Sequence, residues 1–293
     1  MQAKLSSNHT YQCNRDIFDS YDIFLMDIWG VIHDGCNVFN ETVEFLNQYG
    51  SKTIIISNSP SRRNLAINNL HNYGIERTLF NDIYTSGEDA FKEINKLKDG
   101  AKIYHIGTKS QKSIFENINV DIVSDITKSD LLVITGFNPD KPETSQYKEI
   151  FKEAILKKVN AICVNPDKIV SVGGRKIYCS GYLASFYESL GGVVSYHGKP
   201  VKSFYENLNE ISCWKGKKVL VIGDSLSTDI KGANNIGVDS LLVGSGIYED
   251  KIGSNIVEKN IISNIKELIV ESGESPTYFQ KFLSMENSLY KLV

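Results

Sequence analysis

The chain has 293 residues, of which 41% are hydrophobic and 23% charged, an ordinary balance for a folded protein. Its net charge of -3 gives no broad cationic surface and argues against a nucleic-acid binder. No apolar run approaches the roughly 20 residues that span a bilayer, and the N-terminus through Asp16 is polar. The five cysteines are scattered, without the Cys-x-x-Cys pairs of zinc sites or a disulfide framework. We therefore expect a cytoplasmic protein that neither enters a membrane nor is exported.

Short apolar runs alternate with longer amphipathic stretches, which is typical of α/β units around a parallel sheet. In chain order, strands are expected at 24–26, 53–57, 102–106, 130–135, 159–164, 218–222 and 240–243. Helices are expected at 61–73, 110–117, 145–158, 180–190 and 229–235, with a terminal helix after Pro276. The strands at 24–26, 53–57 and 218–222 lack polar alternation, as expected where helices cover both faces of a sheet.

Carboxylates follow two of these strands. Asp27 ends the first apolar run just before a glycine turn, and Asp224 and Asp229 follow the strand at 218–222. Asp27 alone could simply cap a turn. However, ligand sites in parallel sheets lie beyond the carboxyl ends of the strands, where these side chains can converge. Three converging carboxylates repel one another unless a cation lies among them, and hard oxygen ligands favour Mg²⁺.

Hydrogen-bond donors follow other predicted strands. Ser57 and Asn58 end the second strand beside a predicted helix, where they can bind phosphate oxygens or act as ordinary N-caps. Lys199 lies in a Gly-Lys-Pro sequence, in which glycine permits close approach and proline stiffens the backbone. A lysine held in this way can pair with a nucleophile and a transferring phosphoryl group. Together with the carboxylates, these residues indicate phosphoryl-transfer chemistry.

The order of these motifs predicts a divided core. Two of them precede a middle block with its own α/β pattern, and two follow it. We therefore expect a core formed by residues 1–85 and 194–293, with an α/β domain inserted at 86–193.

From about Tyr21 to Tyr248 the sequence resembles haloacid-dehalogenase superfamily hydrolases of class IIA. That class carries a large α/β cap and includes 4-nitrophenyl-phosphatase-like, phosphoglycolate and nucleotide phosphatases. The resemblance includes Asp34-Gly35, the Asn165-Pro166-Asp167 turn and the sequence from Gly223-Asp224 to Thr228-Asp229. It implies a Rossmann-like core with a parallel sheet, an inserted cap that selects the substrate, and hydrolysis of a small phosphorylated metabolite.

The resemblance also implies roles for individual residues. Asp27 would be the nucleophile that forms an aspartyl-phosphate, and Lys199 a catalytic and phosphate-binding residue. Ser57 would bind phosphate, with Asn58 supporting its loop. Mg²⁺ would be held by Asp27, the backbone carbonyl of Trp29, Asp224 and Asp229, the last directly or through water.

Trp29 departs from the family pattern. Family phosphatases have an aspartate two residues after the nucleophile, which protonates the leaving alcohol and later activates water. Trp29 has no titratable proton, and such assistance is worth roughly 10²–10⁴-fold in rate. The sequence therefore predicts slow or atypical turnover, unless a residue such as His33, His105 or His197 supplies the acid.

Other functions fit parts of the pattern. A phosphometabolite-binding or regulatory protein would keep the pocket and lose turnover, as Trp29 suggests. Carbon–halogen or carbon–phosphorus hydrolysis has no further support, because the metal-site aspartates argue against a dehalogenase and no Schiff-base lysine is identified. A nicotinamide-binding enzyme is disfavoured because no Gly-x-Gly-x-x-Gly follows the first strand.

Two further segments are notable. The stretch 165–178, rich in Gly, Lys and Arg, could line the substrate site or form a solvated hairpin. The apolar tail after Pro276 either packs on its own core or forms the interface of a homodimer.

Overall fold

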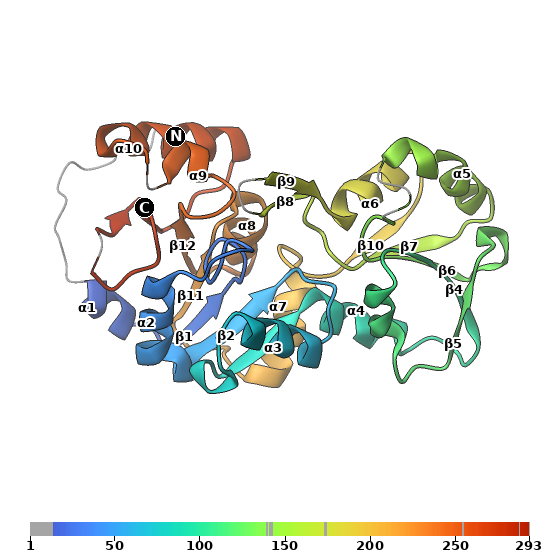
Figure 1. Ribbon diagram of the computed structural model, residues 1–293, viewed down its shortest axis with the longest axis horizontal. Coiled ribbons are helices and arrows are strands. Elements are labelled where there is room, and N and C mark those ends of the chain that lie inside the picture. Colours follow the sequence, from blue (N-terminus) through green and yellow to red (C-terminus); the bar gives the residue numbers. More distant parts are fainter. Residues whose placement is uncertain are drawn as a thin grey trace.

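The computed structural model describes residues 14–138, 140, 143–172, 175–253, 255–286 and 288–292. Two sheets, each with helices against both faces, lie at opposite ends of an elongated molecule (Figure 1). This arrangement confirms the expected α/β class. The polar N-terminal segment through Cys13 lies outside the described residues.

The larger sheet has seven strands, in the order β14-β13-β12-β11-β1-β2-β3, and only the pairing of β14 is antiparallel among them. Its strands are β1 (Ile23–Met26), β2 (Thr53–Ser57), β3 (Asp82–Thr85), β11 (Val219–Gly223), β12 (Asp239–Val243), β13 (Tyr278–Gln280) and β14 (Tyr290–Lys291). Every residue of β1, β2 and β11 is buried, as their continuous apolar sequence predicts. Because β1 lies between β11 and β2, the carboxyl ends of these three strands meet at one edge.

Helices cover both faces of this sheet. On one face, side chains of α1 (Asn14–Asp19), α2 (Asn40–Tyr49) and α3 (Arg63–Asn72) pack against the strands. On the other, α7 (Lys202–Ser212) and α8 (Lys231–Ile236) do so. Helices α9 (Glu249–Ile252) and α10 (Glu258–Ser272) pack with β12, β13 and the π-helical turn η6 (Leu226–Ile230). The carboxyl edge of the sheet is thereby left to its connecting loops.

The smaller sheet has five parallel strands, in the order β10-β7-β6-β4-β5. These are β4 (Ala101–Ile106), β5 (Val120–Val123), β6 (Leu131–Ile134), β7 (Asn160–Cys163) and β10 (Val194–Tyr196). Helices α5 (Lys148–Leu156) and α6 (Ser180–Ser189) pack on one face, and α4 (Ser86–Ile94) and the 3-10 helix η3 (Ser110–Phe115) on the other. A hairpin of β8 (Ile169–Val172) and β9 (Arg175–Tyr178) lies between the two sheets (Figure 1).

Three expectations need correction. The smaller sheet extends through Tyr196, three residues beyond the expected boundary at 193, because β10 pairs with β7. The stretch 110–117 forms the 3-10 helix η3, and residues 226–230 form a π-helical turn before α8. The tail after Pro276 is not a helix: β13 extends the larger sheet beside β12 and β14 pairs with it.

The chain's own core accounts for most of the apolar tail. Phe279 is fully buried, Leu283 is buried, and Met285 packs against the same core cluster. A strand at a sheet edge buries alternate side chains as effectively as an amphipathic helix, so apolar content alone did not decide between them. A homodimer stays a prediction. The apolar tail no longer argues for it, because the tail is largely buried against the chain's own core.

Candidate active site

Asp27 follows β1 at the carboxyl edge of the larger sheet. Its side chain is buried, and its backbone N–H donates to the Ile222 carbonyl at 2.9 Å, which ties it to β11. Gly30 permits the turn that follows: its φ is +75°, and a Cβ there would lie 2.3 Å from Asp224 Oδ2. A side chain at this position would therefore displace a carboxylate of the same cluster.

Lys199 joins two of the carboxylates. Its Nζ lies 2.5 Å from Asp27 Oδ1 and 2.7 Å from Asp229 Oδ1, and only 2% of its side chain is exposed. Burial alone would lower the pKa of Lys199, but Asp229 and Asp27 outweigh it and hold the pKa above its usual value. The lysine is therefore a fixed cation beside the candidate nucleophile.

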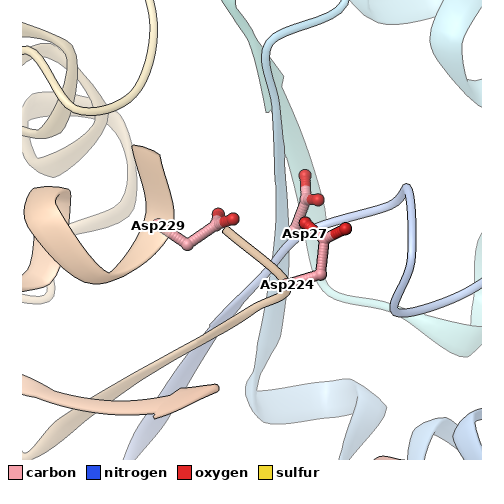
Figure 2. Close-up of side chains that lie close together, drawn as sticks. All are labelled: Asp27, Asp224 and Asp229. Atoms are coloured by element: carbon pink, nitrogen blue, oxygen red, sulfur yellow. The ribbon is translucent and has the colours of Figure 1, made fainter. Parts of the chain in front are cut away.

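Asp224 completes a group of three carboxylates. One oxygen each from Asp27, Asp224 and Asp229 lie within 4.8 Å of one another, and Figure 2 shows Asp229 directed toward the other two. Burial raises the pKa of Asp27 to about 7, with repulsion from Asp229 adding to it and Lys199 opposing it. Burial also raises the pKa of Asp224 well above its usual value, and Asp27 and Asp229 add to the shift.

This donor set fits a divalent cation. One lysine does not balance three carboxylates, of which Asp27 and Asp229 are buried and Asp224 is half-buried. Burial, together with the repulsion between these carboxylates, raises the pKa values of Asp27 and Asp224. All three side chains offer hard oxygen ligands at mutual distances that one ion could bridge. The residues present therefore suit Mg²⁺.

Ser57 and Asn58 both lie at the end of β2, beside Lys199. Ser57 is buried, and its Oγ accepts a hydrogen bond from the Ser59 N–H at 3.1 Å. Asn58 Oδ1 accepts from the Lys199 N–H at 2.7 Å, while Asn58 Nδ2 donates to the Lys199 carbonyl at 3.0 Å and to Asp167 Oδ1 at 2.8 Å. Because both amide hydrogens of Asn58 are engaged, its side chain is placed to orient Lys199 and Asp167 rather than to bind phosphate itself.

Asp167 is the acidic residue that the sequence analysis did not assign to the site. It lies in the loop between β7 and β8, with Asn58 as its partner 109 residues away in sequence. Burial raises the pKa of Asp167 to about 6, although Lys199 and the Asn58 hydrogen bond oppose the shift. Its sequence signals were the Asn165-Pro166-Asp167 turn of the family resemblance and its place in the stretch 165–178, which could line the substrate site.

These residues, except Asp229, line one cavity of about 590 Å³ between the two sheets. The larger sheet supplies its lining from the loops at the carboxyl edge, including Asp27, Ser57, Asn58, Lys199 and Asp224. The segment 165–170 supplies the opposite wall. The expectation that 165–178 lines the site therefore holds for its first part, and β8 and β9 continue as a hairpin.

Trp29 lines the same cavity. A Cβ added to Gly35 would lie 2.6 Å from Trp29 Cζ3 and 2.9 Å from Val172 Cγ1, so Gly35 lies between the indole ring and β8. The position that carries an aspartate in family phosphatases here presents an aromatic ring, which packs edge-on against His33 with ring centroids 4.8 Å apart.

None of the three histidines considered as substitute acids is among the residues lining the cavity. His33 stacks on Tyr73 with ring centroids 4.1 Å apart, and its Nδ1 accepts from the Gly35 N–H at 3.0 Å. His197 Nδ1 lies 2.8 Å from Asp89 Oδ2 on α4, and His105 Nε2 lies 2.8 Å from Thr135 Oγ1 within the smaller sheet. Burial lowers the pKa values of His33 and His105 to about 4.

Family models match both halves of the larger sheet. A haloacid dehalogenase-like hydrolase model matches residues 24–121, and a HAD-hydrolase-like model matches 196–268. The first match includes Asp27 and extends into the smaller sheet as far as β5, and the second includes Lys199, Asp224 and Asp229. The chain belongs to the haloacid dehalogenase-like hydrolases.

Characterised members of this hydrolase family match across most of the chain. A 5'-nucleotidase of Bacillus subtilis is 23% identical over 78% of this chain and 89% of its own length. An acid sugar phosphatase of Staphylococcus epidermidis is 22% identical over 78% of this chain and 90% of its own length. The relatives are phosphatases, so the haloacid dehalogenase-like chain is a hydrolase of that type.

Solved structures share the fold. A haloacid dehalogenase-like hydrolase from Brucella suis superposes with a TM-score of 0.73 at 29% identity, covering 81% of this chain and 90% of that one. A magnesium complex of a glycerol phosphate phosphatase from Mycobacterium tuberculosis gives 0.68 at 22% identity, covering 92% and 77%. Within the described part of this chain, no helix is both long and apolar enough to cross a bilayer.

Proposed function

We propose that the chain is a Mg²⁺-dependent phosphatase that transfers the phosphoryl group of a small metabolite to Asp27 and then to water. The observation that carries the proposal is the buried pair of Asp27 and Lys199, 2.5 Å apart, which lines a cavity and lies beside the carboxylates of Asp224 and Asp229. A cavity of about 590 Å³ is of the size that takes a small metabolite. The names of the relatives point to nucleotides and sugar phosphates as the class of substrate.

The proposed reaction follows from the charges at the site. An Asp27 oxygen attacks phosphorus, and the Lys199 ammonium stabilises the negative charge on the transferring group. Ser57 supplies a hydroxyl for a phosphoryl oxygen, and Asn58 keeps Lys199 oriented. Mg²⁺, held by Asp27, the Trp29 carbonyl, Asp224 and Asp229, would neutralise phosphoryl oxygens and reduce their repulsion of the Asp27 carboxylate.

The two sheets divide this work in the proposal. Residues 1–85 and the segment after Tyr196 form the catalytic core, and residues 86–196 form the cap that closes over the substrate. This division is supported by the two separate sheets and by the cavity between them. A cytoplasmic location stays a prediction.

The test is phosphate release from acetyl phosphate and p-nitrophenyl phosphate with Mg²⁺, comparing wild type with Asp27→Asn. We expect many turnovers by wild type and a loss of at least roughly 1000-fold in the variant, because the covalent step needs the carboxylate. Asp121→Asn, on exposed β5 of the smaller sheet, is the matched control and should keep wild-type activity.

Trp29 supports one other candidate, a phosphometabolite-binding protein that does not turn over. Wild type that binds phosphate only with Mg²⁺, but releases none from either ester, would favour that candidate and contradict the phosphatase proposal.

A further inference from the structure

The proposed reaction needs a proton donor near the leaving oxygen of the substrate. In phosphomonoester hydrolysis the leaving oxygen requires a proton unless its alcohol is strongly acidic, and Trp29 supplies none. The carboxyls that line the cavity apart from the candidate metal ligands are Asp34, Asp167 and Glu249. Each differs in how it is held and in how readily it keeps a proton.

Asp34 and Glu249 are poorly suited. Asp34 Oδ1 accepts from the backbone N–H groups of Cys36 and Asn37 at 2.7 and 2.6 Å. These bonds outweigh the effect of partial burial and lower the pKa of Asp34, so it is ionised at neutral pH. Glu249 is exposed in the first turn of the short helix α9.

Asp167 is fixed through its backbone. Its N–H donates to Asn165 Oδ1 at 2.9 Å, and its carbonyl accepts from the Gly181 N–H at the start of α6 at 3.1 Å. The Asn165 carbonyl in turn accepts from Ser180 Oγ at 2.8 Å. The turn therefore presents the Asp167 side chain from the smaller sheet at a defined position on the cavity wall.

Asp167 is also fixed through its side chain. Oδ1 accepts from Asn58 Nδ2 at 2.8 Å, and the same Nδ2 donates to the Lys199 carbonyl, so one amide links Asp167 to the residue that contacts Asp27. Within the part of the chain that the structure describes, we find no hydrogen bond to Asp167 Oδ2. This second oxygen is the one available to a substrate.

Burial keeps Asp167 partly protonated near neutral pH. Burial raises its pKa to about 6, and repulsion by Asp229 adds to the shift, while Lys199 and Asn58 oppose it. Asp27 is also close enough to interact with it. Burial raises the pKa of Cys163 above its usual value and the pKa of Cys179 to about 12. Both thiols are therefore neutral near pH 7.

We propose that Asp167 is the general acid and base of this enzyme, acting from the cap in place of the aspartate that family phosphatases carry at position 29. The inference rests on the phosphatase function proposed above. In the first step an Asp27 oxygen bonds to phosphorus, the bond from phosphorus to the leaving oxygen breaks, and the Asp167 proton passes to that oxygen. In the second step water attacks the aspartyl-phosphate, its proton returns to Asp167, and Asp27 and inorganic phosphate are released.

The test compares Asp167→Asn with wild type on esters whose alcohols differ in acidity. Asparagine keeps an oxygen to accept from Asn58 and loses only the titrating proton. With glycerol phosphate, whose alcohol is a poor leaving group, we expect kcat/KM to fall roughly 10²–10⁴-fold. With p-nitrophenyl phosphate, whose leaving group needs no proton, we expect kcat/KM to change less than about 10-fold. Asp121→Asn, on exposed β5 and outside the lining of the cavity, is the control and should change neither.

A second readout is the pH dependence with glycerol phosphate. The assay uses saturating Mg²⁺ at every pH, so that Asp27 stays ionised. Because the first step needs protonated Asp167, wild-type kcat/KM should then fall as pH rises through about 6, and this ionisation should be missing in Asp167→Asn. Introducing Trp29→Asp should reduce the loss caused by Asp167→Asn, since it restores a carboxyl at the family position.

A purely structural role for Asp167, in which it only holds the cap against the core, would give a different result. If Asp167→Asn lowers kcat/KM by the same factor on both esters, or if the loss is equal with and without Trp29→Asp, Asp167 only holds the two walls together and the inference is overturned. Failure of the phosphatase proposal itself is distinct, since wild type would then release phosphate from neither ester.

Discussion

The two walls of the cavity differ in what they offer a substrate. The core wall, at the carboxyl edge of the larger sheet, presents charged groups that contact one another: Lys199 bridges Asp27 and Asp229, and Asp224 lies beside them. The cap wall, from 165 to 170, presents one carboxyl, Asp167, and one ammonium group, Lys168, with apolar side chains at Ile169 and Val170. Carboxylates are concentrated where phosphorus would bind, and the segment 165–170 carries a single carboxyl.

This contrast assigns each wall a different part of the substrate. Every phosphomonoester has the same phosphoryl group, so a change to the core wall should affect all substrates by a similar factor. Leaving groups differ, so a change to the cap wall should affect substrates unequally. Three variants test the core side of this division.

Lys199→Met should have the largest effect. Loss of the ammonium removes a donor to the transferring group, and removal of one such donor typically costs roughly 10²–10³-fold in rate. The factor should be the same for glycerol phosphate and p-nitrophenyl phosphate. The variant also leaves Asp27 and Asp229 buried without their cation, and breaking such a pair typically costs about 3–5 kcal/mol of unfolding free energy.

The measurements are initial rates on both esters and urea unfolding. Lys202→Met, at an exposed ion pair with Glu206 on α7, is the matched control and should alter neither. A loss confined to glycerol phosphate would break the comparison, because it would show the core wall acting on the leaving group.

Asp224→Asn should abolish the response to Mg²⁺. Burial and repulsion by Asp27 and Asp229 hold the pKa of Asp224 above its usual value, so bound Mg²⁺ must displace a proton. As pH rises from 5 to 7, the protons held by Asp27 and Asp224 leave and the metal-free fold loses their contribution to stability. The increase in Tm caused by Mg²⁺ should therefore grow over this range in wild type and be near zero in the variant.

The difference between the Tm values with and without Mg²⁺ separates the ionisation of the metal-site carboxylates from that of other groups. Burial lowers the pKa values of His33 and His105, so these residues make the fold more stable as pH rises from about 4 to 6.5. Their contribution is the same with and without Mg²⁺ and cancels in the difference. A Tm increase that is equal at pH 5 and pH 7 would contradict the assignment of these carboxylates as the metal site.

The residues of the core wall could be predicted one by one from the sequence, whereas the cap wall could be predicted only as a stretch, for a physical reason. Asp27 and Asp224 directly follow β1 and β11, and the carboxyl ends of adjacent parallel strands must meet. Asp167 follows no such rule: it lies in a turn of the inserted segment, and its contact with Asn58 depends on how the cap closes onto the core. The sequence contains no signal for that closure.

Other errors have local causes. Residues 194–196 look like the start of the returning core, but hydrogen bonds to β7 make them the edge strand of the smaller sheet. The tail after Pro276 has enough apolar residues for either a helix or a strand, and the exposed edge of β12 selects the strand. In both cases a free sheet edge decided the structure, and sheet edges cannot be located before the strand order is known.

His33→Ala should have the smallest effect on catalysis. His33 is buried beneath Trp29 and Tyr73, and burial lowers its pKa to about 4 against the opposing charge of Asp34, so it is neutral at the pH of the assay. The variant removes the acceptor of the Gly35 N–H and should lower the unfolding free energy by about 1–3 kcal/mol, measured by urea unfolding. The pH profile with glycerol phosphate should keep its shape.

His33→Asn and His71→Ala make this prediction specific. Asparagine offers a short side-chain oxygen to the Gly35 N–H and should recover part of the stability, while His71 is exposed and its loss should change nothing. A profile that loses its ionisation near pH 6 in His33→Ala, but not in Asp167→Asn, would transfer the acid role from the cap wall to the core wall. The core wall would then act on both the phosphoryl group and the leaving group, because one strand end would hold both the nucleophile and the proton donor.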